Sequence, residues 1–152
     1  MGFHLRDTDH GWKARLKGLL ALKAPAHIDV GILESAGVEK DGTSVIDVAE
    51  WNEFGTATIP ERSFIRAWFD EAEPQLRQDF AALMRTVAAG KRTRAEVLEL
   101  MGQRMVGQVQ ARMSAGIPPP NAPSTVRRKG SSTPLIDTGV LRSSVTYRTG
   151  GG

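Results

Sequence analysis

The stretch TPLIDTGVLRSSVTY, residues 133–147, takes the chain from an extended segment through a turn and into its last strand. Asp137 or Thr138 is expected to cap the first turn of a short helix, because a side-chain oxygen at that position accepts a hydrogen bond from a free backbone N–H group. Gly139 relaxes the backbone beside the cap. Residues 140–144 complete the short helix, so the stretch predicts a capped turn that redirects the chain.

The last strand is expected to close a small antiparallel sheet. Residues 145–149 alternate apolar and polar side chains, which is typical of a strand with one apolar face. Residues 27–33 alternate in the same way, and residues 44–49 are rich in β-branched side chains. Because two strands alone are marginally stable, these three are expected to form one sheet, with a hairpin turn at residues 35–43. Residues 150–152 are expected to be a flexible tail.

A short helical turn is expected at residues 49–54, AEWNEF. Trp51 and Phe54 are three positions apart, which places them on one face of a helix. Gly55 follows and is typical of the position that ends a helix. Glu53, Phe54 and Gly55 are therefore predicted to form a structural cap and turn.

Helical periodicity is strongest in residues 63–87, where apolar side chains recur every three or four positions. Pro74 lies inside this pattern and removes a backbone hydrogen bond, so a kink or a restart of the helix is expected near Glu73. Residues 11–23 predict a further, N-terminal helix, whose apolar side should pack on the rest of the chain.

A second long helix is expected to pair with the first as an αα-hairpin. Thr93 and Glu96 have the spacing of a capping box, in which each side chain accepts a hydrogen bond from the backbone N–H group of the other residue. The helix should end near Ala115, before Gly116. Its apolar stripe is interpreted as core or subunit interface and consists of Val97, Met101, Met105, Val109 and Met113.

Residues 117–134 are expected to form a long extended arm. Three consecutive prolines near its start exclude a helix there, and three consecutive basic residues lie near its tip. Such an arm is predicted to dock on a neighbouring subunit or to lie against channel DNA. The residues proposed for this contact are Pro118, Pro119, Pro120, Arg127, Arg128 and Lys129.

Composition indicates one globular domain over residues 1–152. Hydrophobic residues make up 40% of the chain and charged residues 24%. The absence of cysteine excludes disulfides and thiolate chemistry. The net charge of +3 favours an anionic neighbour without specifying nucleic acid. The apolar run at residues 16–26 is interrupted by lysines, so neither a membrane span nor a signal peptide is expected, and the chain is expected to begin in the cytoplasm.

No catalytic, cofactor or metal site is expected. The triplet at residues 137–139, Asp-Thr-Gly, looks like an aspartic protease signature, but it occurs once and lies too near the end of the chain for a protease half to follow it. Residues 89–92 lack the Ser or Thr that a phosphate-binding loop needs after its lysine. No cysteine or helix-spaced partner accompanies the histidines, which are His4, His10 and His27.

Three pieces, read in order, resemble a known family. They are residues 48–56 (VAEWNEFGT), residues 59–64 (IPERSF) and residues 134–145 (PLIDTGVLRSSV). In this order and spacing they resemble the small neck and tail-completion proteins of long-tailed bacteriophages and prophages, the head–tail joining or virion morphogenesis group.

The resemblance implies an α+β subunit with a small antiparallel sheet, packed here against the αα-hairpin and the N-terminal helix, and carrying the proline-rich arm. It implies a non-enzymatic structural protein of the virion, assembled in the host cytoplasm. Its partners would be copies of itself in a homo-oligomeric ring, a hexamer or dodecamer, together with other neck, connector and tail-tube proteins.

Two alternatives remain open from the sequence. Within the same class, the chain is a tail terminator that caps the tail tube. From another class, it is a nucleic-acid-binding accessory protein that contacts phosphates through residues 127–129. The dependence of DNA binding on salt separates the second alternative from a ring subunit.

Overall fold

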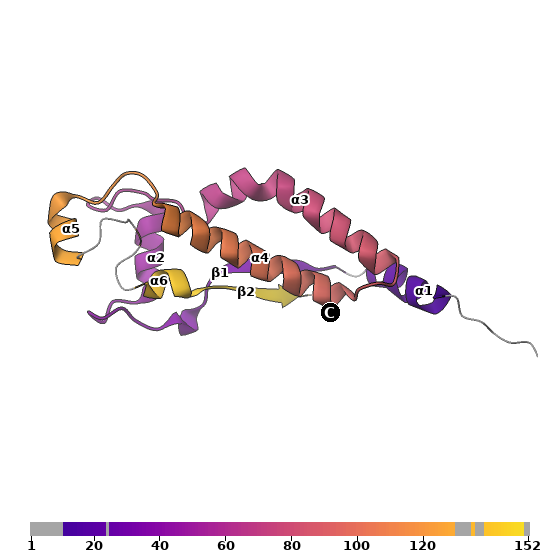
Figure 1. Cartoon of the computed structure of the whole chain (residues 1–152). Coiled ribbons are helices and arrows are strands. Elements are labelled where there is room, and N and C mark those ends of the chain that lie inside the picture. Colours follow the sequence, from indigo (N-terminus) through magenta and orange to yellow (C-terminus); the bar gives the residue numbers. More distant parts are fainter. Residues whose placement is uncertain (1–10, 24, 130–134, 136–138, 151–152) are drawn as a thin grey trace, which may run out of the picture.

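The computed structural model describes residues 11–23, 25–129, 135 and 139–150, and these form a mixed α+β fold. Figure 1 shows an elongated molecule in which two long helices run between α1 at one end and α2, α5 and α6 at the other. The elements in chain order are α1 (Trp12–Ala21), β1 (His27–Ile32), the 3-10 helix η1 (Glu34–Ala36), α2 (Val45–Phe54), α3 (Arg66–Ala88), α4 (Arg94–Ala115), α5 (Pro123–Lys129), α6 (Val140–Ser143) and β2 (Val145–Gly150).

The predicted αα-hairpin is formed by α3 and α4, which are in contact. The capping box at the start of α4 is confirmed: the Glu96 N–H group donates to Thr93 Oγ1 at 3.2 Å, and the Thr93 N–H group donates to Glu96 Oε2 at 2.7 Å. The helix ends before Gly116, whose φ of 83° suits glycine. Both predicted boundaries of this helix therefore agree with the structure.

Helix α3 begins at Arg66 and runs without interruption through Pro74. The expected restart near Glu73 is wrong, and the alternative expectation, a kink at Pro74, stays a prediction. The first expected turn, from Ser63, is not part of the helix. It is a loop segment whose N–H groups are bound by a residue of α2, as described below.

The core lies between the helical hairpin, α2, α6 and the sheet. Four of the five residues of the expected stripe of α4 are buried, and three of them, Met101, Val109 and Met113, belong to this core, with Met105 packed against it. Phe64 is fully buried and belongs to the same cluster. The other buried members are Val45, Ala49, Trp68, Leu76, Ile117, Leu135, Leu141 and Val145.

The sheet described by the structure has two antiparallel strands, β1 and β2, with His27 opposite Gly150 and Ile32 opposite Val145. The pairing of the N-terminal and C-terminal strands is as expected. Gly150 belongs to β2, so its assignment to a flexible tail is wrong, whereas residues 151–152 lie outside the described residues. Helix α4 packs on both strands, and this contact supplies the apolar cover that a two-stranded sheet needs.

The third expected strand is wrong, because residues 45–54 form helix α2. Ser44 is the N-cap, and its Oγ accepts from the Ile46 N–H group at 3.2 Å. Val45 and Ala49, four positions apart, are both buried on one face of the helix. The expected hairpin at residues 35–43 is likewise replaced by η1 and by a single bridge between Val38 and Ser44.

The extended arm is only partly as expected. Residues 118–122 are not helical, but residues 123–129 form helix α5, so the basic tip is helical and not extended. Gly139 occupies the N-cap position of α6 with φ 82°. Asp137 and Thr138 lie outside the described residues, so their capping role stays a prediction.

Candidate functional site

The loop between α2 and α3 is organised around the carboxylate of Glu53, in the last turn of α2. Glu53 is 6% exposed and receives hydrogen bonds from three consecutive backbone N–H groups at the start of α3. The donors are Phe64 N at 2.8 Å and Ile65 N at 3.0 Å on Oε2, and Arg66 N at 2.9 Å on Oε1. The Ser63 hydroxyl adds a fourth bond at 2.7 Å. A buried carboxylate of one helix therefore caps the first turn of the next.

Arg66 completes the charge balance around this carboxylate. Its Nε donates to Glu53 Oε1 at 3.1 Å, and its Nη2 donates to the Glu53 carbonyl oxygen at 2.8 Å and to Glu61 Oε1 at 2.7 Å. Its guanidinium carbon also lies 4.7 Å from the centre of the Phe54 ring. Burial alone raises the pKa of Glu53, but the hydrogen bonds from Ile65, Arg66, Ser63 and Phe64 outweigh it and hold that pKa below its usual value.

Gly55 allows the chain to leave α2 and return to α3. Its φ of 73° and ψ of 169° belong to a region that is essentially restricted to glycine. The loop then closes through a bond from Thr56 N to the Ile59 carbonyl at 2.8 Å, and Thr56 Oγ1 accepts from Ile59 N at 2.9 Å. This closed turn brings Glu61 and the residues after it back against the end of α2.

Arg62 joins the same loop to the three prolines. It is 7% exposed, and its backbone N–H group donates to the Asn52 carbonyl at 2.6 Å. Its side chain reaches across the fold, with Nε donating to the Pro119 carbonyl at 2.8 Å and Nη2 to the Pro120 carbonyl at 3.3 Å. Burial lowers the pKa of Arg62. We call the residues that meet here, Glu53, Gly55, Arg62, Arg66, Pro119 and Pro120, the junction.

The junction brings together residues that the sequence treated as two separate groups. Glu53, Phe54 and Gly55 were predicted as a cap and turn, and the prolines as part of an arm. The sequence did not indicate that Glu53 caps α3, or that Arg62 binds the proline segment. The IPERSF motif marks the segment, but the burial of Arg62, which requires hydrogen-bond acceptors nearby, is seen only in the fold.

Among the remaining predicted residues, the basic ones at positions 127–129 belong to α5, at the same end of the molecule. Arg127 lies on α5 and is exposed. Arg128 and Lys129 are in the same helix, but their side chains lie outside the described part of the structure. In that described part, no group of three or more acidic, histidine or cysteine side chains is placed to hold a metal ion.

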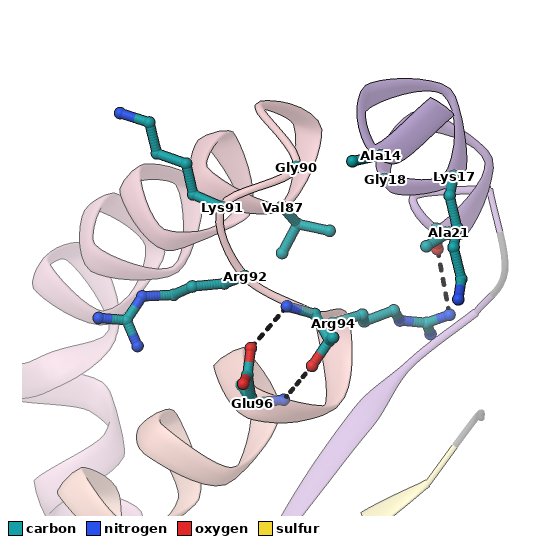
Figure 2. Close-up of a pocket in the computed structure, with 11 residues that line it drawn as sticks. Ala14, Lys17, Gly18, Ala21, Val87, Gly90, Lys91, Arg92, Arg94 and Glu96 are labelled. Carbon is teal, nitrogen blue, oxygen red and sulfur yellow. Dashed lines mark hydrogen bonds between the residues drawn. The ribbon is translucent and has the colours of Figure 1, made fainter. Parts of the chain in front are cut away.

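A pocket lies at the end of the molecule opposite the junction, between α1 and the turn that joins α3 to α4. Figure 2 shows this pocket, of about 350 Å³, with Lys17 on α1 and Lys91 and Arg92 on the turn. Arg94 also lines it, but its guanidinium is already bound to the Ala21 carbonyl at 3.2 Å and to the Pro25 carbonyl. The pocket is therefore mildly basic, with one of its cations used to attach the end of α1.

The fold and the junction define an α+β chain in which a helical hairpin packs on a two-stranded sheet and one helix caps another. No protein-family model matches the chain, and neither a curated protein nor a solved structure matches it. Among the described residues, no helix is both long enough and apolar enough to cross a membrane.

Replacing Arg62 by methionine, which keeps most of the side-chain volume, is expected to release the proline segment. The change removes two charge-assisted hydrogen bonds of about 1.5–3 kcal/mol each. Trypsin should then cleave the chain near Arg127 at least about tenfold faster under native conditions, since 1.4 kcal/mol corresponds to a factor of ten. The rate is measured by mass spectrometry of the digest.

The matched control for this variant is Arg77→Met, because Arg77 is 77% exposed and bonds only to Glu73 one turn away among the contacts described. It should leave cleavage near Arg127 unchanged. Equal cleavage of the Arg62→Met chain and the native chain, with both still folded by circular dichroism, would show that Arg62 does not hold the segment.

Proposed function

We propose that the chain is a structural subunit of a bacteriophage or prophage virion, which assembles as a homo-oligomeric ring at the head–tail junction and joins tail to head around the DNA channel. One observation carries the proposal: the three sequence pieces that resemble neck and tail-completion proteins meet at one end of the fold. The first two pieces form the junction through Glu53 and Arg62. The third supplies α6, which contacts α2, and Leu135 and Leu141, which are buried in the shared core.

The chemistry of the junction supports a structural role. The carboxylate of Glu53 is engaged by backbone and side-chain donors on both oxygens, and the guanidinium of Arg62 is engaged by two carbonyl groups. A carboxylate held in this way has a lowered pKa, which does not suit a general acid. These residues position the proline segment and α5 at the end of the molecule, where a neighbouring subunit would meet them.

Assembly is the mechanism that follows from this role. Large apolar side chains are exposed at both ends of the elongated molecule, on α1 and on α2. Their burial between subunits would supply the free energy of association, and closed symmetry would fix the number of subunits.

The proposal predicts that the purified chain forms a closed ring of six or twelve copies. Size-exclusion chromatography with light scattering should give a mass that is the matching multiple of 16.5 kDa, independent of dilution over a wide range. Deleting the gene should leave full heads beside detached tails in electron micrographs. A strict monomer that is absent from purified virions would rule the proposal out.

The pocket of Figure 2 favours a second candidate, a nucleic-acid-binding accessory protein, because three basic residues, Lys17, Lys91 and Arg92, are among those that line it. Phosphate contacts would give DNA binding that weakens steeply with salt and has no sequence preference. Such binding by the isolated chain, lost when Lys17, Lys91 and Arg92 are replaced by alanine, would favour this candidate over the ring; loss on replacement of residues 127–129 instead would place the DNA contact on α5. Among structural virion proteins, the alternative is a tail terminator, which would stop growth of the tail tube.

A further inference from the structure

Helix α1 packs on the body through its small residues. Gly18 is the buried residue of this helix, and a Cβ atom placed on it would lie 2.0 Å from the carbonyl oxygen of Val87. A Cβ atom on Gly90 would likewise lie 3.0 Å from the Cβ atom of Ala14. Figure 2 shows Ala14 and Gly18 on the side of α1 that faces the turn after α3. This close approach of backbones determines which side of α1 points inward.

The opposite side of α1 carries its large apolar residues, and they face solvent. They are Trp12, Leu16, Leu19 and Leu20, which are 63%, 42%, 47% and 56% exposed, and we call them the α1 face. Their spacing of four, three and one places all four on one side of a helix. Burying one such side chain is worth about 1.5–3 kcal/mol. Within the part of the chain that the structure describes, this helix therefore buries glycine and leaves its main apolar surface uncovered, which is typical of a surface that binds another molecule.

Helix α2 has a second exposed stripe, which combines acidic and aromatic side chains. Its members are Asp47, Glu50, Trp51 and Phe54, at positions i, i+3, i+4 and i+7, and we call them the α2 face. Trp51 is 40% exposed and Phe54 61% exposed. The acidic residues precede the aromatic residues along the stripe, so apolar and negatively charged surface lie side by side.

The two faces complement each other in charge as well as in polarity. Helix α1 contains no acidic residue, and its apolar stripe is flanked by the exposed basic residues Arg15 and Lys17. Helix α2 contains no basic residue and exposes Asp47 and Glu50. Two faces of the same sign would repel at close range, whereas these attract.

The two faces cannot meet within one molecule, because α1 and α2 lie at opposite ends of the elongated fold (Figure 1). We infer that the α1 face of one copy binds the α2 face of the next, in a head-to-tail contact between identical chains. Such a contact uses two different patches on each subunit and therefore propagates until it closes into a ring. The inference rests on the proposed ring for its closure, and it names the surfaces that form the contact.

The test uses one variant for each face of the full-length chain. Leu16→Asp with Leu20→Asp places negative charge on the α1 face, which should then repel Asp47 and Glu50 of a neighbour. Trp51→Ser with Phe54→Ser removes the aromatic side chains of the α2 face without adding charge that could pair with the α1-face variant. Each variant alone is expected to give a mass of 16.5 kDa by light scattering, with the helical content of the native chain by circular dichroism.

Mixing the two variants distinguishes a head-to-tail contact from a symmetric one. The α1-face variant keeps an intact α2 face, and the α2-face variant keeps an intact α1 face, so an equimolar mixture should form a heterodimer that cannot grow further. Its dissociation constant should rise with salt, because the contact pairs opposite charges. Leu100→Asp is the control, since Leu100 is 40% exposed on α4, and it should keep the native assembly.

The outcomes separate this inference from the proposed function. A native chain that assembles, with face variants that assemble equally well, would overturn the α1–α2 contact and leave the ring standing. Variants that stay monomeric when mixed would overturn the head-to-tail arrangement. A face variant that forms a homodimer on its own, through the face it keeps intact, would point instead to contacts between like faces. A native chain that is monomeric at all concentrations would overturn both, and would leave the faces to a different protein.

Discussion

Glu53→Ala is expected to lower the free energy of unfolding by about 3 kcal/mol or more, because each buried donor left without its acceptor costs about 1–3 kcal/mol. The variant leaves the N–H groups of Phe64, Ile65 and Arg66 without their acceptor. It also removes the carboxylate that Arg66 Nε binds at 3.1 Å. Since α2, α3 and the proline segment meet at this point, the loss should affect the cooperative unfolding of the whole domain.

The measurement for this variant is urea unfolding followed by circular dichroism, with Glu50→Ala as the control on the same helix. Glu50 is exposed, so its removal should change the free energy of unfolding by no more than about 0.5 kcal/mol. A Glu53→Ala chain as stable as the Glu50→Ala chain would show that the N–H groups at the start of α3 do not depend on this carboxylate.

The pH dependence of stability provides a separate test of the same carboxylate. Hydrogen bonding holds the pKa of Glu53 in the folded chain below the usual 4.5, so the unfolded chain binds its proton more readily. Its stabilising contribution is therefore complete above pH 4.5 and is lost as the pH falls through the lower pKa of the folded state. The stability difference between the native chain and Glu53→Gln should be largest at neutral pH and shrink below pH 4.5. A difference that stays constant with pH would contradict the assignment.

Local patterns predicted α4 well because every determinant of that helix lies within it. The capping box joins Thr93 to Glu96, the stripe of apolar residues repeats inside the helix, and Gly116 ends it. The same reasoning failed for α2, where β-branched residues favoured a strand. The competing determinants were the Ser44 cap and the burial of Val45 and Ala49 in a common core, and the second of these is a tertiary contact.

The junction could not be derived from local pattern, because its hydrogen bonds connect distant residues. Glu53 binds N–H groups eleven to thirteen positions away, and Arg62 binds carbonyl groups more than fifty positions away. The sequence predicted a cap and turn at Glu53, Phe54 and Gly55, but it did not indicate which residues the Glu53 carboxylate binds. The sequence motifs EFGT and IPERSF identified the correct segments, but only the fold shows that they form one structure with the prolines.

The orientation of α1 was also wrong in the sequence interpretation, which expected its apolar side to pack on the body. Periodicity identifies the apolar side of a helix, but it does not say whether that side binds the same chain or another one. Gly18 determines which side of α1 packs on the body, because only glycine lets the helix approach the Val87 carbonyl so closely. The two criteria, apolar periodicity and close backbone approach, select opposite sides of the helix.

Gly55→Ala is expected to destabilise the fold by about 3 kcal/mol or more, for two reasons that add. The first is conformational, since φ 73° with ψ 169° costs a residue other than glycine about 1–3 kcal/mol. The second is steric: a Cβ atom at this position would lie 2.9 Å from the Glu61 nitrogen and 3.2 Å from the Ile59 carbonyl oxygen. Both are backbone atoms of the turn that closes the loop, so neither can move aside without breaking the Thr56 to Ile59 hydrogen bond.

The same substitution in α4 should have the opposite sign, which makes it the natural control. Gly107 lies inside that helix, and a Cβ atom on it would meet no atom within 4 Å. Gly107→Ala should therefore stabilise the chain by up to about 1 kcal/mol, through helix propensity alone. Urea unfolding of both variants measures the difference directly. If Gly55→Ala proved as stable as Gly107→Ala, the turn at residue 55 would not have the glycine-restricted geometry described here, and Arg62 would have to reach the prolines through a different path of the chain.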